Sequence, residues 1–358
     1  MNGNNHDRGS GSLPVASFRA TILAVFWQFR RFWQSLRVSL FIMLHITNGE
    51  SVTATFRQVR FPGIYLAWND VLHDGPVPQT ETLHELSDIR AQALAEFGCG
   101  DPEKLRASFA TRDRTLENFR QHQDVVLWFE HDLYDQLQLL QLLDWFKQQD
   151  LGAVNLHLIQ INAYPGVRPF YGLGQLSGPQ LARLFPTRKR VTQEQKSIAN
   201  EVWLAFRSAD PGALLAISAQ EHPEMPFLAA ALVRFLEEYP STTNGLARTE
   251  LQVLQAAASG KRKKQEIYMQ SSKQEDVPWG DSSIYLRLDW LAAGPNPALV
   301  ETSKNEFSIT DAGRQLLEGK ADWIKMQGHV NRWLGGVHLS GEQAQWRWDT
   351  EKKTLVTA

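Results

Sequence analysis

Cysteine is almost absent from this chain, because its 358 residues include only one, Cys99. One thiol can form neither an intramolecular disulfide nor a zinc site built from cysteines, which excludes disulfide-stapled secreted domains. Since proteins without disulfides are typical of reducing compartments, we predict a cytoplasmic location. Gly98 and Gly100 flank Cys99 and indicate a turn after a helix, so we interpret the thiol as a turn residue and not as a nucleophile.

Long hydrophobic runs are also missing from the start of the chain. In the first 42 residues the longest uncharged run, 20–29, has ten residues, whereas a helix that spans a bilayer needs about 20. No small-residue cleavage site follows this run in the pattern of a signal peptide. We therefore predict no transmembrane segment.

The first 42 residues differ from the rest in charge. Five arginines against one acid give them a net charge of +4, so the formal −2 of the whole chain leaves −6 for residues 43–358. Three interpretations fit: a membrane-surface helix, a targeting segment, or upstream sequence translated from a wrongly chosen start. We favour the last, because Met43 directly precedes the first strong strand pattern.

Hydrophobic residues make up 43% and charged residues 21% of the chain, which excludes wholesale disorder. One hydrophobic core seldom serves more than ~250–300 residues, so we predict two domains behind the N-terminal extension of residues 1–42. We expect 43–180 to be an α/β ligand-binding or catalytic domain, and 181–358 to be a helical, winged-helix-like domain.

The first predicted domain alternates short apolar runs with longer helical patterns. This alternation is typical of the α/β fold class with a parallel, Rossmann-like sheet and crossover helices. The clearest helix carries leucines at three- and four-residue spacing. We predict strands at 43–47, 64–68, 125–129 and 154–161, and helices from Ser51 and at 81–97, 101–120 and 132–148.

The second predicted domain is mostly helical and ends in an order of elements that is typical of a winged helix. The basic run Lys261–Lys264 is of the kind found in nucleic-acid contacts, which makes DNA a candidate partner. The acidic balance of residues 43–358 weakens general affinity for DNA. We predict helices at 192–208, 226–239, 246–258 and 282–292, a hairpin at 298–310 and a helix from Thr310.

Polar side chains follow each predicted strand. In an open parallel sheet, ligands bind beyond the carboxyl ends of the strands, so we expect these side chains to converge at one edge. Acids, imidazoles, amides and a guanidinium gathered there have the composition of a functional site. They are Thr47, Asn48, Gly49 and Ser51 after the first strand, Asn69, Asp70, His73 and Asp74 after the second, Glu130, His131, Asp132 and Asp135 after the third, and Asn162, Tyr164 and Arg168 after the fourth.

Asn48, Gly49 and Ser51 are predicted to bind the anionic group of a ligand with the N–H groups of a helix N-terminus. The full glycine fingerprint of a dinucleotide site and the lysine of a P-loop are both missing. A plain tight turn with Ser51 as N-cap fits the same residues. Arg168 is the predicted clamp for a phosphate or carboxylate, or else it pairs with an acidic side chain such as Asp70 or Glu130.

Asp70, His73, Glu130 and His131 are the predicted catalytic residues. Asp70 and His73 form an acid–base pair only if their loop folds them together. Glu130 stands where the third strand ends, so its carboxylate should face the site. Asp132 has an acid three residues further on and is interpreted mainly as a helix N-cap, with ligand binding as its second role.

A metal ion and a cofactor find little support in the sequence. Asp70, His73 and Glu130 suit a hard divalent ion, but no metal motif with diagnostic spacing is present, so we predict no metal site. The residues assign no cofactor. His45 lies inside the first strand, where a histidine is more often a hydrogen-bonded core residue than a catalyst.

Three stretches resemble a bacterial family that is catalogued only as a domain of unknown function. They are HITNGES at 45–51, WNDVLHDGP at 68–76 and LWFEHDLYDQLQL at 127–139, and family members have similar HITNGDS, WxDxLxxGP and LWFExDxxDQ motifs. Glu50 stands where the family commonly has an aspartate, which keeps the charge. The tail segments GLARTELQVL, SITDAGRQLL and RWLGGVHL are also similar, so the resemblance covers nearly everything from Met43 onward. It implies no activity, but its recurring polar residues match those at the strand ends.

Three functions follow from these patterns. The leading hypothesis is an α/β enzyme or binding protein for a small anionic ligand of phosphorylated or nucleotide-like character. The second is a DNA-binding regulator that acts through a C-terminal winged helix. The third is a protein-interaction adaptor whose C-terminal region serves as a docking surface.

Overall fold

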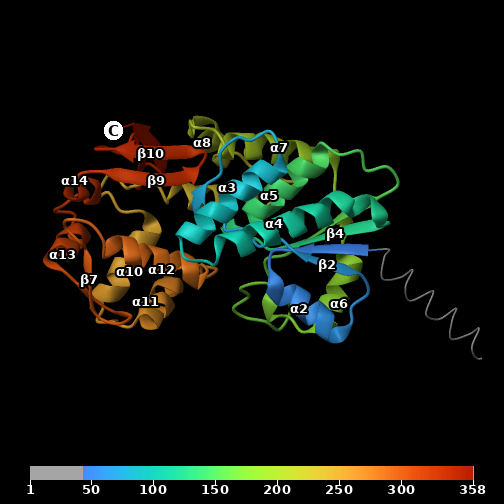
Figure 1. The fold of residues 1–358 in the computed structure, drawn as a ribbon, viewed down its shortest axis with the longest axis horizontal. Coiled ribbons are helices and arrows are strands. Elements are labelled where there is room, and N and C mark those ends of the chain that lie inside the picture. The colour runs from blue at the N-terminus through green and yellow to red at the C-terminus, as the bar shows by residue number, and fades with distance from the viewer. Residues whose placement is uncertain (1–42, 358) are drawn as a thin grey trace, which may run out of the picture.

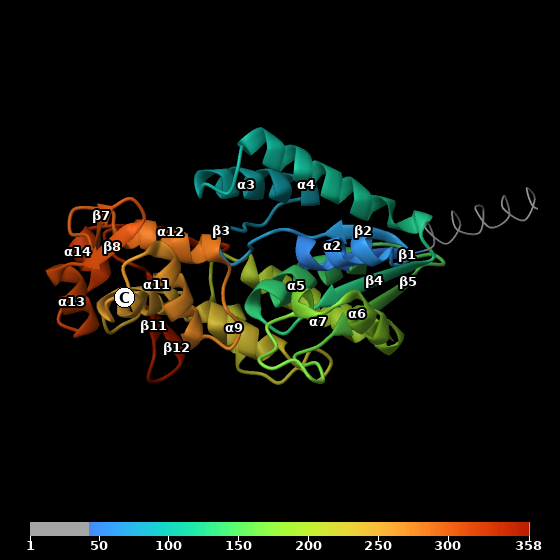
Figure 2. The ribbon, with the colours of Figure 1, turned by 90° about the horizontal axis from the view of Figure 1, so that it is seen from below.

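The computed structural model describes residues 43–357. Figures 1 and 2 show an α/β region at one end of the molecule and a region of helices and short strands at the other. The predicted N-terminal extension, 1–42, lies outside the described residues. Within 43–357, no helix is long and apolar enough to cross a bilayer.

A five-stranded sheet with the order β2-β1-β4-β5-β6 forms the centre of the α/β region. Neighbours among β1 (Met43–Thr47), β2 (Ile64–Ala67), β4 (Asp124–Phe129) and β5 (Asn155–Gln160) pair in parallel, and β6 (Lys189–Arg190) runs antiparallel at the edge. The four predicted strands are therefore confirmed, and the sheet is mostly rather than wholly parallel.

Helices cover both faces of this sheet (Figure 1). On one face, α2 (Glu50–Val59) and α6 (Gly178–Leu184) bury apolar side chains against β4 and β5. On the other face lies α5 (Leu133–Lys147), with α7 (Gln193–Phe206) packed against it. Strands that are buried on both faces read as continuous apolar runs, which is why these strands were visible in the sequence.

Two helices, α3 (Leu83–Glu96) and α4 (Pro102–Glu117), connect β2 to β4 and form a layer of their own in Figure 2. β2 lies next to β1 on one side, and the connection through α3 and α4 then brings the chain to β4 on the other side of β1. The strand order therefore reverses between β1 and β4, and the crevice beyond the carboxyl ends of such neighbours is where open α/β sheets bind ligands.

His45 is a core residue of β1, as predicted. The Trp128 Nε1–H group donates to His45 Nδ1 at 3.1 Å, so Nε2 carries the proton and donates to the Pro62 carbonyl at 3.0 Å. The rings of Phe56, Phe61 and Trp128 lie around the imidazole. Burial of this neutral ring lowers the pKa of His45 to about 4.

Acidification from pH 6.5 to pH 4 is expected to reduce the free energy of unfolding by about 3 kcal/mol through His45. The unfolded chain takes up a proton near pH 6.5, whereas the folded protein does so only near pH 4, so the stabilisation is complete above pH 6.5 and is lost as the pH falls. Chemical denaturation of wild type and His45→Gln at several pH values measures this. Burial also lowers the pKa of His73 to about 4, and that titration remains in the variant. His45→Gln should therefore lose about 3 kcal/mol less than wild type between pH 6.5 and pH 4, and an identical pH dependence of the two proteins would contradict the assignment.

The C-terminal region confirms the predicted helices and hairpin and adds strands that we did not predict. The hairpin consists of β7 (Leu299–Ser303) and β8 (Glu306–Ile309). The region is less helical than expected because four further strands follow: β9 (Val330–Gly335), β10 (Val337–Gly341), β11 (Trp346–Asp349) and β12 (Thr354–Thr357). Its helices are α8 (Gly212–Ser218), α9 (Leu228–Leu236), α10 (Arg248–Ala258), α11 (Lys264–Ser271), α12 (Asp281–Leu291), α13 (Asp311–Leu317) and α14 (Trp323–Gln327).

The two regions are joined by backbone pairing and by a buried charge network. The short strand β3 (Gly75–Pro76), which follows β2, pairs in parallel with β9. Arg287 on α12 contacts Asp74 at 2.5 Å and Glu238 at 3.4 Å, and all three side chains are buried. One continuous apolar cluster extends from Leu44 to Leu355, across the domain boundary predicted near residue 180.

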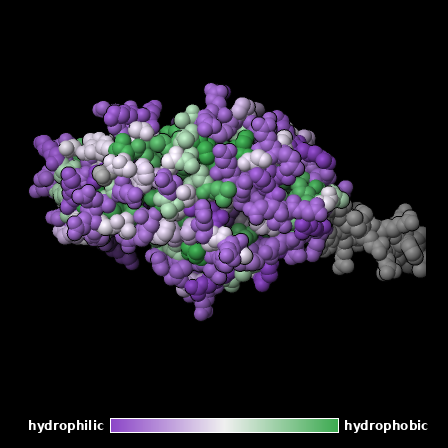
Figure 3. Space-filling model, turned by 90° about the horizontal axis from the view of Figure 1, so that it is seen from above, coloured by the Kyte–Doolittle hydropathy of each residue, from purple (hydrophilic) through white to green (hydrophobic). Residues whose placement is uncertain are grey.

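Most of the face shown in Figure 3 is hydrophilic, with apolar side chains in small separate patches. Large exposed apolar side chains among the described residues include Leu204 and Met269, on α7 and α11. Scattered apolar residues of this kind are ordinary on a protein surface. They therefore point to no binding face.

Candidate functional site

Asn48 and Glu130 meet at the point where the strand order reverses. Asn48 directly follows β1, and Glu130 directly follows β4. The Asn48 Nδ2 group donates to Glu130 Oε2 at 3.2 Å and to Asp135 Oδ2 at 2.7 Å. One amide thus holds two carboxylates across the gap between the neighbouring strands.

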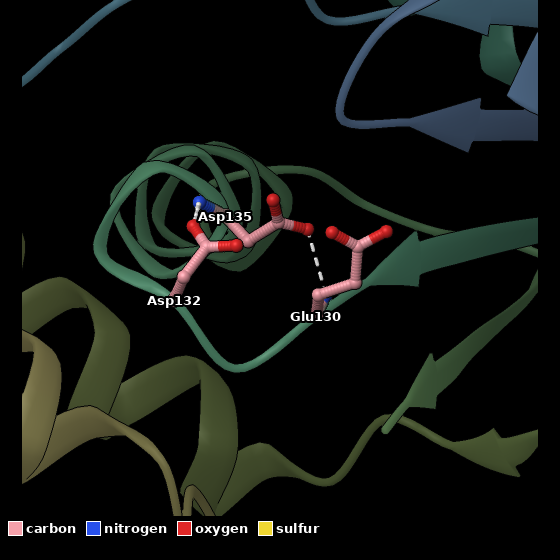
Figure 4. A group of neighbouring side chains, drawn as sticks. All are labelled: Glu130, Asp132 and Asp135. Carbon is pink, nitrogen blue, oxygen red and sulfur yellow. Dashed lines mark hydrogen bonds between the residues drawn. The ribbon is translucent and has the colours of Figure 1, made fainter. Parts of the chain in front are cut away.

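Asp132 and Asp135 complete an acidic cluster with Glu130 at the junction of β4 and α5 (Figure 4). Asp132 is the N-cap of α5, as predicted, and accepts a hydrogen bond from the Asp135 N–H at 3.1 Å. Asp135 accepts from the Glu130 N–H at 2.6 Å. Oxygens from the three carboxylates lie within 4.8 Å of one another, which is close enough for a single proton or a single cation to relieve their repulsion.

The buried position of this cluster favours protonated carboxyl groups. Burial, and secondarily the charge of Asp132, raises the pKa of Glu130 to about 8, although the hydrogen bonds from Leu173 and Asn48 oppose the shift. Burial likewise raises the pKa of Asp132 and of Asp135, and the Glu130 charge adds to the shift at Asp135. Glu130 therefore carries a proton at neutral pH that it can give up, which is a property of general acids and bases.

A glycine-containing loop covers Glu130 from the far side. The Leu173 N–H group donates to Glu130 Oε1. A Cβ on Gly172 would lie 2.5 Å from Glu130 Oε2, and one on Gly174 would lie 2.6 Å from Ser51 Oγ. Only glycine allows the backbone this close, so the loop is shaped around the two polar side chains. The loop belongs to the Gly/Pro-rich stretch that follows β5, and sequence reasoning did not assign it to the site.

A cleft of about 910 Å³ opens beside the acidic cluster, and both regions of the molecule line it. The α/β region contributes the strand-end residues and the glycine loop. The opposite wall comes from α9, α10 and the segment before α12, and four of its charged side chains are ion-paired to one another: Arg234, Glu237, Arg248 and Glu275. The lining from this second wall includes Ser218, Arg234, Glu237, Arg248, Glu275, Asp276, Trp279 and Ser282.

The cleft brings together six of the nine residues that we predicted as catalytic or ligand-binding. His131 lines it, and its ring lies 5.9 Å from that of Phe227 in the C-terminal region. His73 also lines it, with its ring 4.4 Å from that of Trp279. The predicted residues in the lining are Asn48, Ser51, His73, Glu130, His131 and Asp132.

Asp70 does not join them, although we predicted it as a catalytic residue. Its carboxylate is fully buried, and it accepts a hydrogen bond from Arg90 Nε at 2.9 Å. Arg90 also donates to the carbonyl groups of Val71, Asp74 and Pro76. Asp70 and Arg90 thus fix the shape of the loop that carries His73, and the loop directs Asp70 away from the cleft.

Gly49 and Arg168 also lie outside the lining of the cleft. Gly49 is the N-cap of α2 with extended backbone, so the alternative that made Ser51 the N-cap was wrong. Arg168 is exposed in the loop after β5, and no ion pair links it to a described residue, so its alternative role as a partner of Asp70 or Glu130 is not found. The exposed loop allows the long side chain to extend into solvent.

Comparison of the chain with protein-family models found no match, and comparison with curated proteins found none either. The arrangement of the residues themselves therefore carries the functional argument.

Proposed function

We propose that this protein binds a small polar ligand in the cleft beyond β1 and β4 and exchanges a proton with it through Glu130. The observation that carries the proposal is the contact between Asn48 and Glu130 at the reversal of strand order. Ligand sites in open α/β sheets concentrate at such reversals. A buried carboxyl whose pKa is raised toward neutrality, in a cleft, is typical of an acid–base catalyst.

The lining argues against a bare anion as the ligand. A phosphorylated or nucleotide-like molecule, which the sequence led us to expect, would bring its phosphate against Glu130, Asp132 and Asp135. Such a phosphate is compatible with the lining only when a cation accompanies it. The protein remains a candidate enzyme on this proposal. Asn48 positions Glu130, and Ser51 in the first turn of α2 provides a polar contact for the ligand.

A thermal-shift screen of the full chain against nucleotides, sugar phosphates, amines and divalent ions tests the proposal. A ligand at ~100 times its dissociation constant adds about 2.7 kcal/mol of stability, so a hit is easily detected. Calorimetry should then find its affinity strongly reduced in Asn48→Ala, and also in Glu130→Gln, because glutamine cannot give up the proton that Glu130 transfers when the ligand binds. Arg168→Ala is the matched control and should bind as wild type does. A ligand whose affinity is the same in all four proteins would place the function elsewhere.

DNA binding through a winged helix at 248–309 is the second candidate function, and one contact favours it. The backbone of Lys263 forms an isolated antiparallel β-bridge with that of Glu306 on β8. The segment between α10 and α11 therefore pairs with the hairpin, as the first strand of a winged helix does. Lys263, Lys264 and Lys304 line a second pocket of about 470 Å³. We rank it below the cleft because α12 exposes Asp281 and Asp289 to any DNA that it would contact. A gel shift that disappears when Lys261–Lys264 become alanine would raise its rank.

A further inference from the structure

The buried imidazole of His73 has a fixed tautomer. Ser283 Oγ donates its single proton to Asp74 Oδ2 at 2.5 Å, and it lies 3.1 Å from His73 Nε2. Burial opposes ionisation of Asp74, but the Arg287 guanidinium beside it holds the pKa of that carboxyl below its usual value, so Asp74 is an acceptor. Ser283 Oγ must therefore accept from Nε2, which places the proton of His73 on Nε2.

This tautomer leaves a lone pair on His73 Nδ1. Nδ1 is buried and has no hydrogen-bond partner among the described residues, and only 3% of the His73 surface is exposed. A buried acceptor without a donor is unfavourable, and His73 lines the same cleft as the acidic cluster. The Nδ1 atom of His131, another lining residue, is also buried without a partner among residues 43–357.

The charged groups of the lining are mostly acidic. Six carboxylates line the cleft, against two arginines. Both arginines are already paired, since Arg234 contacts Glu238 and Glu275 and Arg248 contacts Glu237 and Glu275. Negative charge stays in excess even when Glu130, Asp132 and Asp135 are all protonated, because Glu237, Glu275 and Asp276 then face two arginines. The cleft thus offers two unpaired imidazole acceptors and an excess of negative charge.

We infer that the ligand of this cleft carries a protonated amine, and that His73 Nδ1 accepts a hydrogen bond from it. The inference rests on the proposed function and adds the chemical class of the ligand. A cationic donor satisfies the unpaired Nδ1 atom and neutralises part of the acidic lining in one step. His73 is then a ligand-binding residue, and Ser283 and Asp74 position it by holding its proton on Nε2.

Butane-1,4-diamine is the probe, and butane-1,4-diol and butanedioate are matched probes of the same chain length. Calorimetry with the full chain should detect binding of the diamine, and no binding of the diol or the dianion. His73→Gln keeps an amide donor near the Nε2 position and removes the acceptor at Nδ1, so it should weaken diamine binding about tenfold or more. In wild type, the ¹⁵N resonance of His73 Nδ1 should start at the value of an unprotonated nitrogen and move when the diamine binds.

Each outcome decides between this inference and the proposed function. Diamine binding with an unmoved Nδ1 resonance, or with equal affinity in His73→Gln, would overturn the role of His73. If Mg²⁺, Mn²⁺ or an anion binds in a Glu130-dependent way and the diamine does not, the amine class fails and the proposed function stands. If the diamine binds equally well to Glu130→Gln and Asn48→Ala, it does not use this cleft and both proposals fail. Because the resonance is measured in wild type, a His73 variant that misfolds does not end the test.

Discussion

Replacing Glu238 by glutamine is expected to lower the free energy of unfolding by about 3–5 kcal/mol. Glu238 is fully buried, and its carboxylate contacts Arg234 at 2.8 Å and both Arg287 and Arg332 at 3.4 Å. Although burial opposes ionisation, these guanidinium groups hold the pKa of Glu238 far below its usual value. Glutamine keeps the shape and removes the charge, so three largely buried cations lose their shared partner. Urea denaturation at pH 7 measures the loss.

An exposed ion pair provides the control for this substitution. Glu318 contacts Lys320 at 2.7 Å, and both side chains are mostly exposed. Pairs of this kind contribute little, so Glu318→Gln should leave the denaturation midpoint almost unchanged. If Glu238→Gln behaved like Glu318→Gln, the buried network would not be what holds α9, α10 and α12 to the α/β region.

Glu130→Gln is expected to stabilise the protein at high pH, by an amount on the order of 4 kcal/mol. The folded-state pKa of Glu130 is raised to about 8, mainly by burial, while the unfolded chain ionises near its usual value of 4.5. Wild type therefore has the full contribution of this group below about pH 4.5 and loses it as the pH rises through 8. Glutamine resembles the protonated form and does not titrate, so the variant keeps that stability.

Denaturation of wild type and Glu130→Gln at pH 4.5 and at pH 8.5 checks this prediction. The two proteins should be similar in stability at the lower pH, and the variant should be the more stable at the higher pH. Glu96→Gln, on the exposed side of α3, serves as the control and should show no such divergence. Equal stability of wild type and Glu130→Gln at pH 8.5 would mean that Glu130 is ionised in the folded protein. A cleft residue whose ionised form lowers the free energy of unfolding is typical of a functional site.

The sheet and most helices could be predicted because local patterns determine them. The strands at 125–129 and 154–161 are runs of apolar residues, and the helix at 133–147 repeats leucine with helical spacing. The side chains after each strand then followed from the general rule for parallel sheets, which correctly grouped Asn48 with Glu130. The rule works because it needs only the order of elements along the chain.

The fate of individual side chains could not be predicted, because it depends on partners far away in sequence. Asp70 looked like a catalytic acid, and what removes it from the cleft is Arg90, twenty residues further along. The second wall of the cleft comes from Arg234, Arg248 and Trp279, which no local motif connects to Glu130. Only tertiary packing decides such pairings.

The strands near the end of the chain were missed for a different reason. Gly335 and Gly336 separate two short segments and lie at the turn between β9 and β10, with Gly335 at a φ of 60°. A Gly-Gly pair between alternating residues is a hairpin signal, and it was present in the sequence. Arg332 and Trp333 obscured the alternation, because Arg332 is buried here by its ion pairs with Glu238 and Glu250.

The pairing of β3 with β9 has a consequence for how the molecule is made. Gly75 and Pro76 pair with Leu334 and Gly335, so this ladder closes only after about 260 further residues have been synthesised and have left the ribosome. During synthesis the α/β sheet can form early, while residues 218–282, which provide the second wall, are still to come. A nascent chain therefore holds Glu130 at the end of a finished strand but has nothing to enclose a ligand. On the proposed function, a ligand therefore cannot be enclosed until the chain has been synthesised beyond residue 282.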